Sequence, residues 1–94
     1  ADHCWIEYKY KDNLPAKLSS KIKINLSEQQ RIWLTRQKQH GVFTYVVFAS
    51  GDLVYVTDDF ELTHITVEQF KNQAVPFKIF IQVLTNFCLG ETND

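Results

Sequence analysis

The sequence predicts an α/β domain with a small mixed β-sheet flanked by helices. Three stretches carry this prediction: an aromatic and apolar stretch at residues 4–10, a helical pattern at 27–40, and a nearly continuous β-branched and aromatic stretch at 42–49. A strand, a helix and a buried strand in that order are typical of α/β proteins. Ninety-four residues are enough for one small core, so we expect residues 1–94 to form a single domain.

The first predicted strand contains the sequence WIEYKY at residues 5–10. Side chains alternate between the two faces of a strand, so Glu7 and Lys9 project from one face and the even-numbered residues from the other. A carboxylate beside an ammonium group at a sheet edge is suited to bind a hard cation and to position an attacking water. Opposite charges two residues apart are also common on solvated strands, so the pair alone does not establish a site.

A loop is predicted at residues 11–20, followed by a short extended segment at 22–24. Ser27 and Gln30 match the capping box, in which the Ser hydroxyl accepts from the N3 amide and the Gln side chain reaches back to the cap. Gly41 is the expected stop at the C-terminal end of this helix.

One face of the predicted helix should pack on the sheet. Gln30, Trp33, Leu34 and Gln37 have the i, i+3, i+4, i+7 spacing of a single helix face. We therefore expect Trp33 to join Leu34 in the core. Trp5 is either a core residue or an aromatic surface for bases.

The strand predicted at 42–49 should be covered on both faces, because its apolar residues do not alternate with polar ones. Residues 50–52 form a turn, and 53–56 return antiparallel. An acidic loop at 58–61 follows.

Thr66 and Gln69 form a second capping box at the start of a short helix. Residues 77–89 are apolar, and their length before Gly90 favours a helix over a strand.

Positive charge is concentrated between residues 9 and 38, which contain eight cationic side chains and only two acidic ones. Such a segment beside Glu7 is suited to contact nucleic-acid phosphates. The alternative interpretation is a solvated loop and helix whose lysines serve only solubility. The candidate nucleic-acid-binding residues are Lys11, Lys17, Lys21, Lys23, Arg31 and Arg36.

Cys4 and Cys88 lie far apart and lack the spacing of a zinc site, so we expect free, buried thiols and a reducing cytoplasm, in a bacterial or phage-infected cell. No stretch approaches the roughly 18 uncharged residues of a membrane span.

The combination of these motifs resembles a known nuclease family. The sequence WIEYK at 5–9, followed by LSEQQRIWLTR at 26–36 and by Gly41, is similar to small phage-type nucleases of the PD-(D/E)XK superfamily, close to the VRR-NUC group. In that group a W-(I/V)-E-x-K strand precedes an L-S-x-x-Q-x-x-W helix and a glycine. The resemblance covers about residues 4–57 and implies a restriction-endonuclease-like core.

The resemblance implies a role for each matching residue. Glu7 would bind Mg²⁺ or Mn²⁺ together with the main-chain carbonyl of Tyr8, and Lys9 would orient the water or stabilise developing negative charge. Gln30 would form hydrogen bonds near the metal or the substrate phosphate. The implied activity is a divalent-metal-dependent endonuclease that hydrolyses DNA phosphodiester bonds, on branched or flapped DNA. We also expect a homodimer, because a domain this small gains core and a second active site from pairing.

One element of the family pattern is missing from this sequence. The pattern includes an Asp on a strand about a dozen residues before the Glu-x-Lys motif, whereas only six residues precede Glu7. The first strand is absent from this chain, or the Asp comes from another chain, or Asp2 serves as a ligand in an unusual geometry. The alternative function is a catalytically degenerate nucleic-acid-binding or regulatory protein with the same fold. A third reading is an interaction module that uses the acidic C-terminal half.

Overall fold

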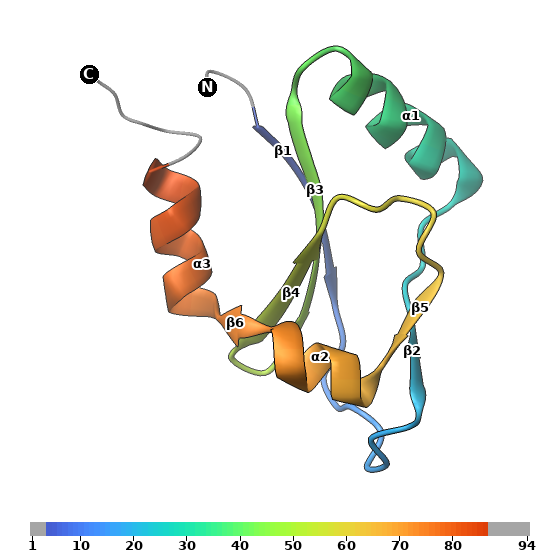
Figure 1. The fold of residues 1–94 in the computed structure, drawn as a ribbon, viewed down its shortest axis with the longest axis vertical. Helices are drawn as coiled ribbons and strands as arrows, with labels where there is room; N and C mark the ends of the chain where they lie inside the picture. The colour runs from blue at the N-terminus through green and yellow to red at the C-terminus, as the bar shows by residue number, and fades with distance from the viewer. Residues whose placement is uncertain (1–3, 87–94) are drawn as a thin grey trace.

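A computed structural model describes residues 4–86 and confirms the predicted α/β class (Figure 1). The elements are β1 (Cys4–Tyr10), β2 (Lys21–Lys23), α1 (Glu28–Gln39), β3 (Phe43–Ser50), β4 (Leu53–Thr57), β5 (His64–Thr66), α2 (Val67–Gln73), β6 (Val75–Pro76) and α3 (Phe77–Leu84).

The main sheet is mixed and has the strand order β1-β3-β4-β6. Strand β1 pairs in parallel with β3, whereas β4 is antiparallel to both β3 and β6. Strands β2 and β5 form a separate antiparallel pair. Figure 1 shows α1 and the β2–β5 pair on one side of the main sheet and α3 on the other. The strand with the Glu-x-Lys motif therefore lies at one edge of the sheet.

Hydrophobic packing covers β3 on both faces, as its sequence predicts. Val46 and Phe48 join a large core cluster with Leu34 of α1 and Phe70 of α2. Val47 and Ala49 instead pack with Val54, Ile6 and Phe80 on the face toward α3. The alternation of side chains along a strand explains why neighbouring residues of β3 contribute to different clusters.

The predicted local signals are confirmed at both helix starts and at both turns. The capping boxes of Ser27–Gln30 and Thr66–Gln69 are both formed. Gly41 follows α1 with φ of 83°, and Gly51 connects β3 to β4 with φ of 58°. Both angles lie in the left-handed region that glycine adopts without steric cost.

Two short strands were not predicted. Strand β5 has three residues with a single buried side chain, Ile65, which faces Ile22 of β2 in the register. Strand β6 has only two residues. Neither is long enough to show a period of two in the sequence, and each depends on a partner elsewhere in the chain.

Two expectations about individual side chains are wrong. Trp33 is not a core residue, because 38% of it is exposed. It lies above Trp5 at the sheet edge, where no strand of the described residues continues the sheet past β1. Cys4 is not a free thiol but part of a disulfide, so the cysteines no longer argue for a reducing compartment. Cys88 lies outside the described residues.

Helix α3 is confirmed as a helix up to Leu84, and the last three residues of the predicted segment, 87–89, lie outside the described residues. None of its side chains is buried, and several large apolar ones are exposed: Phe77, Ile79, Ile81 and Val83. No helix within residues 4–86 is long and apolar enough to cross a membrane.

We predict that Phe70→Ala lowers the free energy of unfolding by about 3–5 kcal/mol, because a buried aromatic side chain leaves a cavity when it is truncated. Phe70 has no exposed surface and contacts Phe48 edge-on with ring centroids 5.9 Å apart. Phe77→Ala is the matched control, since 43% of Phe77 is exposed. Urea denaturation followed by circular dichroism measures both, and equal effects would contradict the assignment of the core.

Candidate metal and nucleic-acid site

The side chain of Glu7 is the meeting point of two elements that are distant in the sequence. Its Oε2 accepts a hydrogen bond from Gln30 Nε2 of α1 at 3.1 Å and lies 3.8 Å from Lys9 Nζ. Glu7 and Lys9 are both about one quarter exposed. The predicted catalytic residues Glu7, Lys9 and Gln30 are thus brought together in one half-buried cluster that remains open to solvent.

The helix cap orients Gln30 toward Glu7. The Oε1 of Gln30 accepts from the main-chain N–H of Ser27 at 3.0 Å, while the Gln30 N–H donates to Ser27 Oγ at 3.1 Å. Because the amide oxygen is held by the cap, the amide nitrogen is the group that faces the carboxylate. The capping box therefore starts the helix and also presents a donor to Glu7.

The main-chain carbonyl of Tyr8 faces away from β3. The N–H of Lys11 donates to the carbonyl of Ala49 at 3.0 Å. The N–H and C=O groups of the odd-numbered residues of β1 therefore point toward β3. Backbone groups of alternate residues turn to opposite sides of a strand, so the groups of Tyr8 point to the open edge. A carbonyl oxygen and the Glu7 carboxylate are both ligand types that Mg²⁺ prefers.

Glu7 is the only carboxylate among the described residues that line the hollow at this site. No group of three or more His, Cys, Asp or Glu side chains within residues 4–86 is arranged to hold a metal ion. Asp2 lies outside the described residues.

Two tryptophans border the cluster. Trp5 shares the strand face of Glu7, and its ring contacts that of Trp33 edge-on, with centroids 4.5 Å apart. A shallow hollow beside Glu7 is lined by Gln29, Gln30 and Trp33. The sequence carried the signal for this proximity, because Trp5 precedes Glu7 by two residues and Trp33 follows Gln30 by three.

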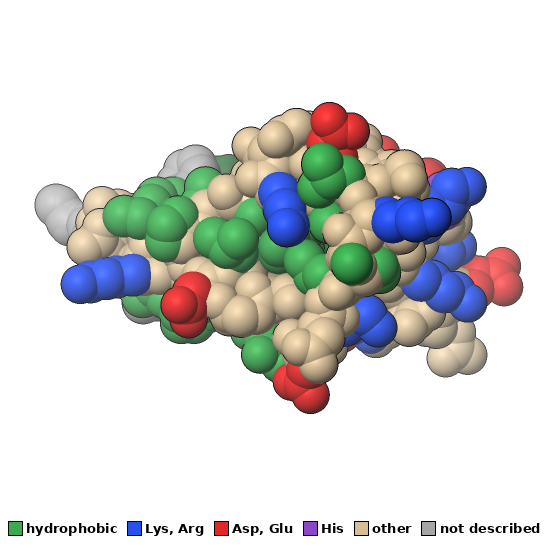
Figure 2. All heavy atoms as spheres, turned by 90° about the horizontal axis from the view of Figure 1, so that it is seen from below, with side chains coloured by type: hydrophobic (Ala, Val, Ile, Leu, Met, Phe, Trp, Pro, Cys, Tyr) green, Lys and Arg blue, Asp and Glu red, His purple; other side chains and the backbone are tan. Residues whose placement is uncertain are grey.

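Four lysines line a groove that continues from Lys9 along the end of β1: Lys9, Lys11, Lys21 and Lys23. Among residues 4–86, no acidic side chain lines it. Ile22 is buried between Lys21 and Lys23, so the alternation of β2 turns both lysines outward. Figure 2 shows Lys and Arg side chains gathered toward the β2 side of the lower face, and hydrophobic ones toward α3. Three of the candidate nucleic-acid-binding residues therefore share one groove with Lys9, which the sequence placed only in the catalytic pair.

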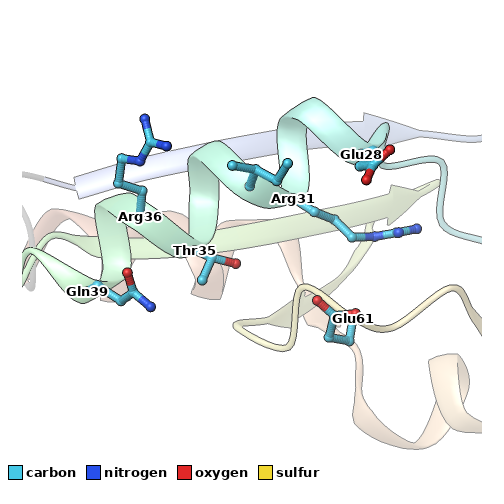
Figure 3. A pocket seen from close by; sticks show the side chains of 7 residues that line it. Glu28, Arg31, Thr35, Arg36, Gln39 and Glu61 are labelled. Atoms are coloured by element: carbon cyan, nitrogen blue, oxygen red, sulfur yellow. The ribbon is translucent and has the colours of Figure 1, made fainter.

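The other candidate cations do not join this groove. Arg31 and Arg36 line a separate hollow on α1 together with Glu28 and Glu61, and Figure 3 shows their side chains pointing in different directions. Residues five apart in a helix are separated by about 140° around its axis, which explains the divergence. Arg31 Nε is buried and has no hydrogen-bond partner among the described residues. Lys17 is exposed in the loop between β1 and β2 and lines neither hollow.

Comparisons with protein-family models, with curated proteins and with solved structures found no match to this chain.

We predict that Gln30→Glu destabilises the fold near pH 7 by about 1 kcal/mol, because it keeps the cap acceptor but turns a carboxylate oxygen toward Glu7. Chemical denaturation at pH 7 measures the effect.

Gln69→Glu is the matched control for this variant. Gln69 occupies the same position in the Thr66 capping box, and its side-chain hydrogen bonds among the described residues stay within that box. Equal changes in the two variants would contradict the contact between Gln30 and Glu7.

Proposed function

We propose that this protein is a divalent-metal-dependent endonuclease that hydrolyses DNA phosphodiester bonds. The observation that carries the proposal is the convergence of Lys9 and the cap-oriented Gln30 on Glu7 Oε2, at 3.8 Å and 3.1 Å. The resemblance of residues 4–57 to PD-(D/E)XK nucleases relates the same three side chains to one active site, within a restriction-endonuclease-like core.

The chemistry of the cluster supports the proposal. Glu7 and the outward carbonyl of Tyr8 would hold Mg²⁺ or Mn²⁺, whose charge would act on a phosphodiester oxygen and on an attacking water. Lys9 would place its ammonium group beside the phosphate and stabilise negative charge there. Gln30, fixed by the cap, would donate to Glu7 and hold that carboxylate in place.

The open edge of β1 supports a further part of the proposal. Magnesium sites that act on phosphates commonly use one or two protein carboxylates together with waters and the substrate. A second carboxylate would come from a strand that pairs with β1, from the other subunit of a homodimer, or from Asp2. Dimerisation remains a prediction, which sedimentation equilibrium tests by measuring the mass of the protein in solution.

The alternative function is a nucleic-acid-binding or regulatory protein of the same fold that does not cleave. The groove formed by Lys9, Lys11, Lys21 and Lys23 favours this alternative as much as it favours the nuclease, because phosphate contacts require only positive charge. The two functions differ in whether the Glu7 carboxylate is required for activity.

We predict metal-dependent cleavage of DNA that falls by about 100-fold or more in Glu7→Gln, because the charge that holds the metal is lost. Labelled single-stranded, duplex and four-way-junction DNA would be incubated with the chain in Mg²⁺, Mn²⁺ or EDTA. Lys9→Ala should also abolish cleavage. The matched control is Glu68→Gln, which removes an exposed carboxylate from α2.

Binding without cleavage, unchanged by Glu7→Gln, would overturn the nuclease proposal for this chain and favour the non-cleaving alternative.

We predict that the double variant Lys21→Ala, Lys23→Ala weakens DNA binding and lowers the slope of log affinity against log salt by about 1–2, because each phosphate contact contributes about 0.9. Lys71→Ala with Lys78→Ala is the matched control, since these lysines lie on α2 and α3. Salt-dependent anisotropy titrations measure both slopes. Equal effects would mean that only net charge acts and that the groove is not the binding surface.

A further inference from the structure

The two tryptophans of the chain form one exposed aromatic surface. Trp5 is 45% exposed and Trp33 is 38% exposed, although their rings touch edge-on with centroids 4.5 Å apart. In an edge-to-face contact the edge of one ring meets one face of the other, so the two indoles do not bury each other completely. Large aromatic side chains exposed together are typical of surfaces that bind a partner or ligand.

This surface is aligned with the cluster at Glu7. Trp5, Glu7 and Lys9 project from the same face of β1, at a spacing of about 7 Å per two residues. Trp33 lies one turn after Gln30, which donates to Glu7, and both border the hollow beside Glu7. The aromatic pair therefore lies on one side of the carboxylate, and the lysine groove begins on the other side at Lys9.

We propose that the Trp5–Trp33 pair stacks on an unpaired base while the lysine groove binds the backbone of the same strand. The ligand class is single-stranded DNA or an unpaired segment of a branched DNA. Along about 20 Å of β1, the DNA strand would then contact the tryptophans through a base, pass the Glu7 carboxylate and contact the lysines through its phosphates. The identification of this strand as a substrate rests on the proposed function, whereas its binding does not.

An unpaired strand fits these observations better than a duplex does. Bases within a duplex are stacked on each other and do not offer their faces to a side chain, whereas single strands stack their bases on aromatic residues. The lysines also line a single groove, whereas Arg31 and Arg36 line a separate hollow with two acidic residues. One groove and one aromatic surface match one strand.

Intrinsic fluorescence tests this inference directly, because both tryptophans of the chain belong to the proposed surface. The full chain would be titrated in EDTA with a thymidylate 12-mer, an abasic 12-mer with the same backbone, and a blunt duplex of equal length. We expect the thymidylate strand to change the fluorescence and to bind about 5- to 150-fold more tightly than the abasic strand, the range for stacking of one base. The duplex should bind more weakly than the thymidylate strand.

Variants separate stacking from charge. Trp5→Ala should remove most of the difference between the thymidylate and abasic strands and leave the salt dependence unchanged. Lys21→Ala with Lys23→Ala should weaken both strands and keep the difference between them. The comparison of thymidylate with abasic DNA uses the unmodified chain, so it stands even where a variant does not fold.

Equal affinity for the thymidylate and abasic strands, or tighter binding of the duplex, would overturn the inference. The titration in EDTA measures binding separately from metal-dependent cleavage. Base-dependent binding in EDTA, together with no cleavage in Mg²⁺ or Mn²⁺, would reject the nuclease and keep the stacking surface. Cleavage without base-dependent binding would do the reverse.

Discussion

The parallel ladder between β1 and β3 runs through seven register pairs, from Cys4↔Phe43 to Tyr10↔Ala49, and the remainder of the described fold depends on it. Parallel neighbours cannot be joined by a tight turn, so the chain between them must cross a face of the sheet. That crossing contains β2 and α1, and it brings Gln30 over Glu7, 23 residues away. Without the parallel register, the carboxylate and its donor would not meet.

The helix cap then converts this rough proximity into a defined contact. Ser27 occupies one end of the Gln30 amide, which leaves only the donor end for Glu7. The Thr66 box at α2 has the same local chemistry, and its side-chain hydrogen bonds among the described residues remain within the box. The two caps differ in their surroundings, because of the two helices only α1 begins beside a strand with an acidic side chain, which is Glu7 of β1.

The position of β1 at the sheet edge gives the site its openness. An interior strand has a neighbour on each side, whereas the backbone groups of Tyr8 point to an edge that no strand within residues 4–86 covers. The same absence of a neighbour leaves Trp5 and Trp33 exposed. The half-buried carboxylate, the outward carbonyl and the exposed indoles therefore have one structural cause. The ladder to β3 and the packing of Ile6 against Val47, Ala49 and Val54 attach that edge strand to the rest of the sheet.

The sequence by itself determined the helices and the longer strands, because capping boxes, glycine stops and strand alternation each depend on residues only a few positions apart. It determined that Glu7 and Lys9 share a face, and that Ser27 and Gln30 begin a helix. It did not determine the exposure of Trp33 or the disulfide at Cys4, since both depend on residues or edges far along the chain. The pairing of β2 with β5 and the separation of Arg31 and Arg36 from the lysine groove were likewise decided by tertiary structure. Long-range pairing fixes which surfaces meet, and no short sequence pattern encodes that choice.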